Sequence, residues 1–294
     1  GGGSLSYANT LYRPGSGFFE DRQWPRGEWE VELAPHYATA KRMLGVVDQY
    51  PAVGPVERMM RDAAADLGVE ASFRLAPTGV FYGEPGVKVP DPFFGGDGPD
   101  RTGCTFCGNC MVGCRVGAKN TLMKNYLALA ERRGATIEAM RTATEVVPRK
   151  GGGFTVTTER SGAWLGKELR RVSAEQVIFA GGTWGTQQLL HRMKHAGALP
   201  AISDALGRLT RTNSEALDGA VAVRVPESMG LASGVAITTS FHLDDRTHVE
   251  NVRYGPGSNL MGALATFLVP GDKGLSVRLG SLVRQAIRAP LTAL

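Results

Sequence analysis

Every cysteine of the chain falls in one short stretch, which holds Cys104, Cys107, Cys110 and Cys114. The C-x2-C-x2-C-x3-C spacing lets four thiolates converge on a single iron–sulfur cluster, with Gly108 and Gly113 relieving the crowded backbone. Arg115 follows the last cysteine, where bacterial ferredoxins have proline, and no second motif of this kind occurs. A tetrahedral zinc site and structural thiols, reduced or disulfide-linked, are the alternatives. The cysteines therefore predict a tight loop that either binds a metal or packs its thiols without one.

The first half of the chain alternates loops with helices. Residues 1–35 are loop-like and rich in aromatic side chains. Apolar residues recur at helical spacing over 36–44 and 53–67, which predicts two helices. The density of Gly, Pro and Asp over 83–108 indicates an extended surface loop that leads into the cysteines. An amphipathic pattern over 120–132 predicts a third helix.

The second half mixes strands with one clear helix. We expect strands at 144–148, 154–158 and 176–180. The run 177–180 has the pattern of a buried strand, and it leads through a glycine turn into a helix at 183–195. Further strands are expected at 220–225, 235–242, 248–254 and 263–269. The pattern predicts a mixed α/β chain with a second, sheet-based region.

Two glycine-rich turns are candidates for a phosphate site. The run at 1–4 is either an expression linker or a place where backbone amides approach a phosphate or a flavin. The turn at 180–186 lies between the expected strand and helix, where a dinucleotide meets a helix start. It lacks the full G-x-G-x-x-G spacing, so ordinary strand-to-helix packing is an equal alternative.

The net charge of +5 and the pI of about 9.1 come from basic residues dispersed along the chain. This dispersion disfavours nucleic-acid binding. The basic surplus lies mostly at Lys167, Arg170, Arg171, Arg208, Arg211, Arg278, Arg284 and Arg288. Solvated faces explain it most simply, and a lipid substrate would permit a peripheral membrane contact. The sequence begins at Gly1 without Met, so we expect it to be an incomplete piece. Its localisation is left open, because a signal peptide would precede such a start.

Several separated blocks, taken in order, resemble the GMC oxidoreductases, and in particular their actinobacterial, cholesterol-oxidase-like branch. The blocks are residues 1–12, the cysteine loop with 117–122, 180–190 and 209–215. The similarity covers essentially the whole chain. It implies a partial FAD-binding, Rossmann-like domain of the α/β class and a substrate domain of mainly antiparallel sheet.

The resemblance also implies how the domains divide along the chain. It gives an FAD-binding piece at 1–35, a helical and loop insertion at 36–103, the cysteine loop with the continuing FAD-binding domain at 104–212, and a truncated substrate domain at 213–294. The family's opening G-x-G-x-x-G strand and its distal His and Asn have no match. On this basis the chain alone is not expected to catalyse.

Cofactor contacts are implied residue by residue. The glycine run would lie along the FAD pyrophosphate through Gly1, Gly2, Gly3 and Ser4. Asn9 would lie near the isoalloxazine ring and Val146 beside the adenine. Gly182 and Thr183 would approach the diphosphate or the ribityl chain.

The activity implied is hydride transfer to FAD from an alcohol, with the 3-hydroxyl of a sterol as the leading substrate. Glu250 matches a strand glutamate above the flavin and is a candidate base for alkene isomerisation, with an exposed strand carboxylate as the alternative. None of the five histidines lies in a matching motif. An iron–sulfur cluster would pass electrons to an external acceptor in place of oxygen. A sugar or another alcohol as substrate, and a metal-binding electron-transfer module, remain the competing hypotheses.

Overall fold

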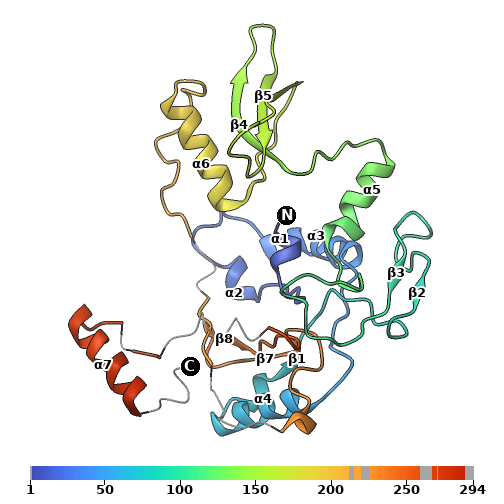
Figure 1. Ribbon diagram of the computed structural model, residues 1–294, viewed down its shortest axis with the longest axis vertical. Coiled ribbons are helices and arrows are strands. Elements are labelled where there is room, and N and C mark those ends of the chain that lie inside the picture. The colour runs from blue at the N-terminus through green and yellow to red at the C-terminus, as the bar shows by residue number, and fades with distance from the viewer. Residues whose placement is uncertain (1, 212–214, 220–225, 259–266, 270, 289–294) are drawn as a thin grey trace. The chain divides into compact units, whose positions relative to one another are not determined.

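The computed structural model divides the chain into two compact units (Figure 1). One unit comprises Gly3–Arg133 and Asp218–Leu294, and the other Gly134–Leu217. The structure describes residues 2–211, 215–219, 226–258, 267–269 and 271–288. Gly1, the expected strand at 220–225 and most of that at 263–269 lie outside these residues. Within them, no helix has the length and apolar character needed to cross a membrane.

The helices of the first unit are mostly short. They are α1 (Gly3–Ser6), α2 (Ser16–Phe19), α3 (Trp29–Met43), α4 (Pro55–Asp66), α5 (Tyr126–Arg132) and α7 (Leu275–Arg288). Single 3-10 turns occur at Glu70–Ser72, Leu122–Lys124 and Glu227–Met229. The predicted helix at 53–67 is confirmed as α4, which starts with proline at its first position. The Glu57 carboxylate reaches back to the amide of Gly54 at 2.6 Å and satisfies a donor at this helix start.

Helix α3 begins before its predicted start. Pro35 lies inside the helix, although proline was expected to precede it. Proline removes one backbone hydrogen bond from a helix interior. Glu30 and Glu32 in the first turn favour the positive end of the helix dipole and support the earlier start. The predicted helix at 120–132 is likewise divided, because the chain breaks at Asn125 between the 3-10 turn and α5.

Two antiparallel sheets belong to the first unit. Strands β1 (Arg74–Leu75), β7 (Thr239–His242) and β8 (His248–Glu250) form one sheet in the order β1-β7-β8. The other is the pair β2 (Lys88–Val89) and β3 (Arg101–Thr102), which lies inside the stretch predicted as an extended loop. Strands β7 and β8 are shorter than the predicted runs 235–242 and 248–254. The antiparallel sheet containing β7 and β8 agrees with the expected sheet-based region.

The hydrophobic core of this unit draws on segments far apart in the sequence. Its buried members are Ala8, Tyr50, Ala76, Val80, Cys104, Cys110, Ala118, Val235, Ala236 and Ile237. The amide of Ala76 donates to the carbonyl of Thr238 at 2.8 Å, so the segment before β7 is held against β1. The cysteine loop therefore packs into the core of the first unit.

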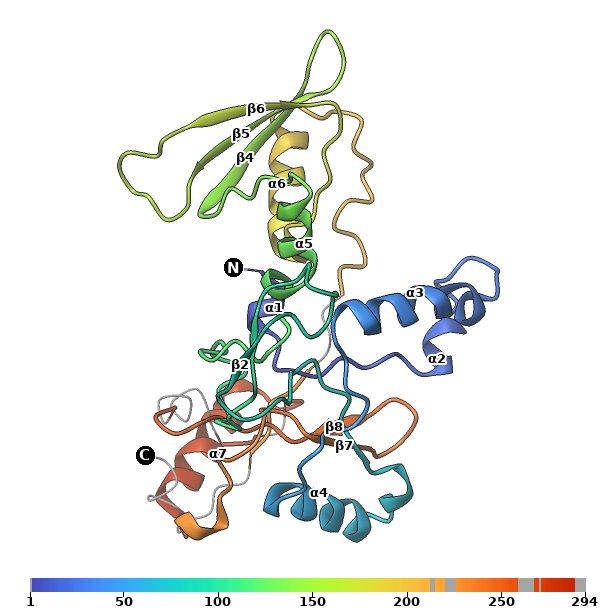
Figure 2. The same cartoon turned by 90° about the vertical axis from the view of Figure 1, so that its right-hand side faces the viewer.

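The second unit is a three-stranded antiparallel sheet with one helix against it (Figure 2). Its elements are β4 (Arg141–Pro148), β5 (Phe154–Arg160), β6 (Arg170–Ala174) and α6 (Gly182–His195). Val146 of β4 and Met193 of α6 are both buried, and the Val146 amide donates to the Met193 sulfur at 3.3 Å. The predicted strands at 144–148 and 154–158 and the helix at 183–195 are confirmed.

The prediction of a buried strand at 177–180 is wrong. Strand β6 ends at Ala174, and 177–180 has no strand partner within the described residues. Ile178 is 90% exposed. An apolar run forms a buried strand only when strands beside it and layers above it cover both faces, and the second unit supplies neither.

Replacing Glu57 with Gln is expected to lower the free energy of unfolding by about 3–5 kcal/mol, because it leaves the buried Arg253 guanidinium without its counter-charge. Urea denaturation measures the change. Asp48→Asn removes the exposed pair with Lys41 and is the matched control, with a cost below about 1 kcal/mol. Equal effects of the two substitutions would contradict this assignment.

The same ion pair predicts a pH dependence. Burial by itself would raise the pKa of Glu57, but the Thr238 hydroxyl and the Arg253 charge outweigh it and lower the pKa below 4.5. The pair contributes fully above the unfolded pKa, and this contribution is lost as pH falls through the lower folded pKa. Unfolding free energies measured below pH 4.5 should decline more steeply for the unsubstituted protein than for Glu57→Gln; parallel curves would refute the prediction.

Candidate functional site

The four thiols of the cysteine loop occupy two environments. Cys104 and Cys110 are buried in the core, whereas Cys107 and Cys114 are half-buried. The Cys104 sulfur accepts the amide of Phe106 at 3.4 Å, and the Cys114 sulfur accepts the amide of Lys119 at the same distance. Burial raises the pKa of Cys104 to about 12 and that of Cys110 to about 11. Thiols in such surroundings stay protonated.

The metal site predicted for this loop stays a prediction. Among the residues that the structure describes, which include all four cysteines, no group of three or more His, Cys, Asp or Glu is arranged to hold a metal ion. Core packing places Cys104 and Cys110 by their apolar contacts, which explains the departure from a shared ligand geometry. In the described structure, the four cysteines are arranged as packed structural thiols, the alternative to a cluster or a zinc site.

Gly108 relieves backbone crowding between the cysteines, as predicted. Its φ of +71° lies in the left-handed region, and a Cβ there would come within 2.8 Å of the carbonyl oxygen of Ala232. The loop therefore needs glycine at this position. A Cβ at Gly113 would meet no atom of the described residues within 4 Å, but its φ of +93° also lies in the left-handed region and favours glycine there.

Two buried cations flank the cysteine loop. The Lys119 ammonium donates to the carbonyls of Tyr7, of Leu5 at 3.2 Å and of Cys110 at 3.0 Å. The Arg101 guanidinium donates to the side chain of Asn120 and to backbone carbonyls, including that of Ala118 at 2.6 Å. Neither has a carboxylate partner in the described part of the chain. Carbonyl oxygens therefore compensate both charges and tie the loop to the N-terminal segment.

Asn9 is fully buried and clips the N-terminal segment to the chain before β7. Its Nδ2 donates to the carbonyl of Ile237 at 2.7 Å, and its Oδ1 accepts the amide of Ile237 at 3.0 Å. Ser4 of α1 accepts the amide of Leu122 at 3.1 Å through its hydroxyl. Both residues implied as flavin contacts thus have structural partners, and their cofactor roles stay predictions.

The glycine turns leave room for a ligand. A Cβ at Gly2, Gly3 or Gly182 would meet no atom of the described residues within 4 Å. Gly182 opens α6 with a φ of +70°, and the Thr186 hydroxyl accepts the amide of the preceding Gly181 at 3.0 Å. A helix start beside an open backbone suits a phosphate group. Val146 lies in β4 with its side chain packed beneath α6, and its place beside the adenine stays a prediction.

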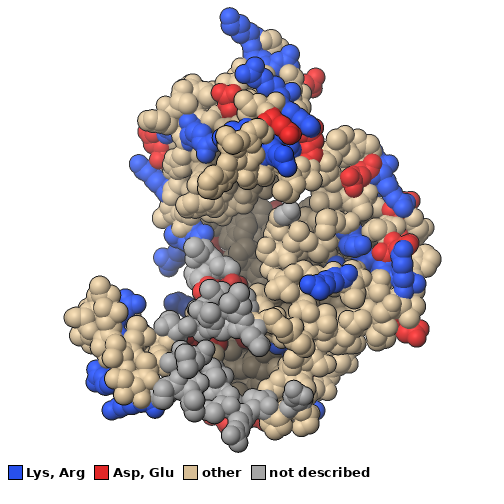
Figure 3. Space-filling view, in the orientation of Figure 1, with Lys and Arg blue, Asp and Glu red and all other residues tan. Residues whose placement is uncertain are grey.

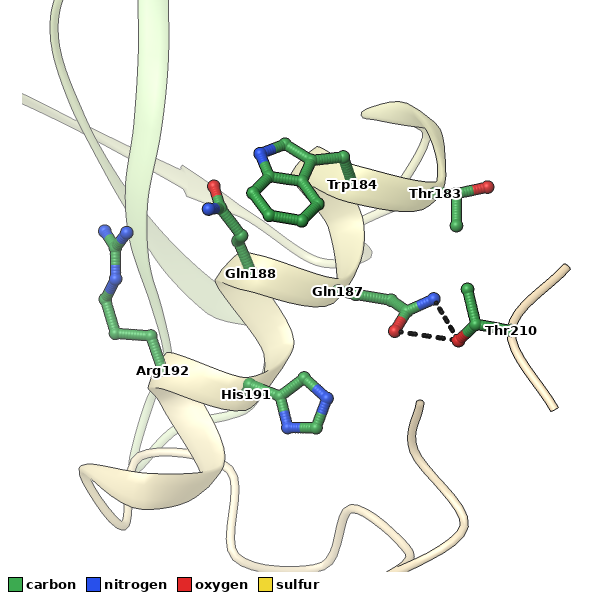
Figure 4. Close-up of a pocket in the computed structure, with 7 residues that line it drawn as sticks. All are labelled: Thr183, Trp184, Gln187, Gln188, His191, Arg192 and Thr210. Atoms are coloured by element: carbon green, nitrogen blue, oxygen red, sulfur yellow. Dashed lines mark hydrogen bonds between the residues drawn. The ribbon is translucent and has the colours of Figure 1, made fainter. Parts of the chain in front are cut away.

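A pocket of about 480 Å³ lies beside α6 (Figure 4). Its lining consists of Thr183, Trp184, Gln187, Gln188, His191, Arg192 and Thr210. Gln187 and His191 point towards Thr210, whose hydroxyl accepts from the Gln187 amide at 3.0 Å. Thr183 belongs to the same row of side chains at four-residue spacing. Thr183, one of the predicted cofactor residues, therefore lines an open pocket beside α6.

Glu250 lies on a sheet face that carries several polar side chains. Ser240 pairs with Glu250 across β7 and β8, and His242 pairs with His248. Because side chains alternate along a strand and opposite residues share a face, these four side chains lie together. Arg74 of β1 is opposite Ser240 and joins the same face. We call this set, with Tyr12 above it, the polar sheet face.

Tyr12 links the members of the polar sheet face. Its hydroxyl donates to the Ser240 hydroxyl at 2.9 Å and contacts the Glu250 carboxylate. Its ring meets the His248 ring edge-on at 5.0 Å, and the rings of His248 and His242 stack at 4.6 Å. Burial raises the pKa of Tyr12 above its ordinary value, while burial, His242 and Arg74 lower the pKa of His248. The arrangement can hold and pass a proton between a carboxylate and neutral donors.

Motif analysis missed Tyr12, Ser240 and the two histidines of this face. The alternation of polar residues at 240 and 242, and again at 248 and 250, is the signal that could have found them. Tyr12 carries no such signal, since only the folded chain brings it over β7 and β8.

Comparison with known proteins gives consistent matches. Residues 98–198 match the family model described as GMC oxidoreductase. The chain is 50% identical over 278 residues to a cholesterol oxidase of Mycobacterium tuberculosis strain H37Rv, with 92% of this chain and 48% of that protein covered. It is 41% identical over 285 residues to a cholesterol oxidase of Acinetobacter baumannii, covering 93% and 50% respectively. The chain thus spans about half the length of the curated relatives it matches.

Alkylation tests the two thiol environments. In the native protein at pH 8, iodoacetamide should label Cys107 and Cys114 first, with Cys104 and Cys110 slower by about tenfold or more, because the thiolate is the reacting form. Mass spectrometry of peptides measures each rate, and unfolding in urea is the control that equalises them. Uniform protection of all four, released by a chelator, would instead indicate a bound metal.

Proposed function

Since the chain belongs to the GMC oxidoreductase family, we propose that the protein is an FAD-dependent oxidoreductase that acts on the 3-hydroxyl of a sterol. The observation that carries this proposal is the 50% identity to a cholesterol oxidase across 92% of the chain. The polar sheet face, which brings a carboxylate and several proton-holding groups together, supports it from the structure.

The cofactor in this proposal is FAD, which supplies the redox chemistry when bound by accepting a hydride from the carbon that carries the hydroxyl. The residues that would hold it are those that the resemblance implied. Open backbone at Gly2, Gly3 and Gly182 supports close approach of a diphosphate, and the pocket edge at Thr183 supports contact with its polar groups. Ser4, Asn9 and Val146 complete the proposed set, and Gly1 lies outside the described residues.

Glu250 is the proposed base for moving a proton during alkene isomerisation. A carboxylate is suited to this step when its surroundings hold it in place and exclude water. The Tyr12 hydroxyl contacts Glu250 and is itself anchored on Ser240. Tyr12 therefore acts as a positioning residue, since it orients the carboxylate from the side of the N-terminal segment.

Oxygen is the proposed electron acceptor. The competing route, through an iron–sulfur cluster in the cysteine loop to an external acceptor, finds no ligand geometry in the described thiols. Iron and acid-labile sulfide analysis after anaerobic purification distinguishes the two. If iron and sulfide are found in stoichiometric amounts together with flavin, the protein is a dehydrogenase and not an oxidase. If they are found without flavin, it is an electron-transfer module.

The test of the proposed function is optical. We expect the full-length protein that contains this chain to show flavin absorbance that bleaches under anaerobic conditions when a 3-hydroxysterol is added. A 3-ketosteroid is the matched control, because it lacks the oxidisable hydroxyl. Absence of bound flavin would end the proposal, and bleaching by sugars or simple alcohols but not by sterols would change the substrate.

Glu250→Gln should lower the isomerisation rate by about 10²–10⁴-fold, because the amide cannot accept the proton, and should change the flavin bleaching rate by less than about tenfold. Ultraviolet absorbance of the conjugated ketone measures the isomerisation, and flavin absorbance measures the oxidation of the alcohol. Glu159→Gln, a strand carboxylate of β5, is the control and should change neither.

Tyr12→Phe keeps the ring packing on His248 and removes only the hydroxyl that contacts Glu250. We expect a smaller loss of isomerisation than in Glu250→Gln, together with a shifted pH profile of that step. Loss of flavin bleaching in Tyr12→Phe, with isomerisation of added unconjugated ketone intact, would contradict the positioning role.

A further inference from the structure

Helix α7 carries an apolar stripe along one side. Leu275, Leu279, Val283 and Ile287 follow one another at four-residue spacing, so their side chains lie in one row. Each is between 52% and 74% exposed, and α7 has no buried residue. An outward row of this kind is the apolar half of an amphipathic helix.

The other side of α7 is basic. Arg278, Arg284 and Arg288 lie away from the stripe, and the helix contains neither Asp nor Glu. Val277 lies among these arginines, outside the stripe. In the space-filling view, the tan surface of α7 is bordered by blue basic groups (Figure 3). The helix thus combines an apolar row with an unbalanced positive charge.

We propose that α7 docks on an anionic lipid membrane surface, with the apolar stripe at the acyl boundary and the arginines at the headgroups. Charge complementarity selects this occupant, because three arginines without a carboxylate favour anionic headgroups. The 14 residues of α7 extend about 21 Å at 1.5 Å per residue, less than the hydrocarbon thickness of about 30 Å. The helix therefore lies in the interface. The proposal goes beyond the oxidoreductase function and needs neither flavin nor sterol.

Vesicle co-sedimentation of the purified protein tests this docking. We expect binding to phosphatidylcholine vesicles that contain about one-third phosphatidylserine, with weaker binding to phosphatidylcholine alone and a decline at high salt. Arg278→Gln and Arg284→Gln should each lower the partition coefficient on the anionic vesicles by about fivefold. Neither should change binding to neutral vesicles.

The apolar stripe has a matched control. Leu279→Gln should lower the partition coefficient by about tenfold or more, because it removes apolar surface from the lipid contact. Val277→Gln makes the same kind of change on the arginine side, at similar exposure, and should stay within about twofold of the unsubstituted protein.

Three outcomes would overturn the proposal. Absence of binding to anionic vesicles is the first, and equal losses in Leu279→Gln and Val277→Gln are the second. The third is a change in the protein itself, in which Leu279→Gln lowers the melting temperature by several degrees, or dissociates a dimer seen by light scattering, without affecting vesicle binding. That result would assign the stripe to a contact within the protein or with a second copy.

Discussion

The buried ion pair between Glu57 and Arg253 is the contact on which the candidate site depends. It joins helix α4 to the chain just after β8, and the Thr238 hydroxyl donates to the same carboxylate at 2.6 Å. Asn251 accepts the amide of Thr239 at 2.9 Å and fixes the start of β7. These bonds position β7 and β8 from beneath. The polar sheet face can keep its register because the layer below it is tied by charge and hydrogen bonds.

Burying these charged and polar groups carries a desolvation penalty, and some of their atoms remain without hydrogen bonds. Two such atoms, Nε of Arg253 and Nδ2 of Asn251, have no hydrogen-bond partner in the described structure. Unsatisfied buried donors are unfavourable, so strong compensation must come from the remaining bonds. Glu57 supplies part of it by bonding Gly54, Thr238 and Arg253 at once. One carboxylate thereby stabilises a helix start and a sheet together.

The cysteine loop is also organised by buried charges, which here are the cations of Lys119 and Arg101. Lys119 and Arg101 are buried without carboxylates in the described residues, and backbone carbonyls of the loop and of the N-terminal segment surround them. The loop is therefore shaped by two cations and by apolar packing of Cys104 and Cys110. In the described structure, these contacts hold the four thiols in place without any metal-ligand arrangement.

Local patterns account for the elements that were predicted well. Helices α4 and α6 and strands β4 and β5 each have a period, cap or glycine boundary within their own residues, and these signals act over a few positions. The run at 177–180 has an equally clear apolar pattern, yet burial depends on neighbours that the run does not contain. A local preference also failed at Pro35, which lies inside α3 behind a first turn that carries Glu30 and Glu32.

For the candidate site, the amino-acid order was sufficient to place Glu250 on a strand, to mark the turn before α6 and to indicate the family. Polar alternation along β7 and β8 hints at Ser240 and the two histidines, whereas Tyr12 came from the fold alone. Tyr12 lies more than two hundred residues from β7 and β8, and pairing between strands sets which polar side chains stand opposite one another. Contacts between side chains so far apart in the sequence depend on strand register and burial. These are properties of the packed chain, and no single segment determines them.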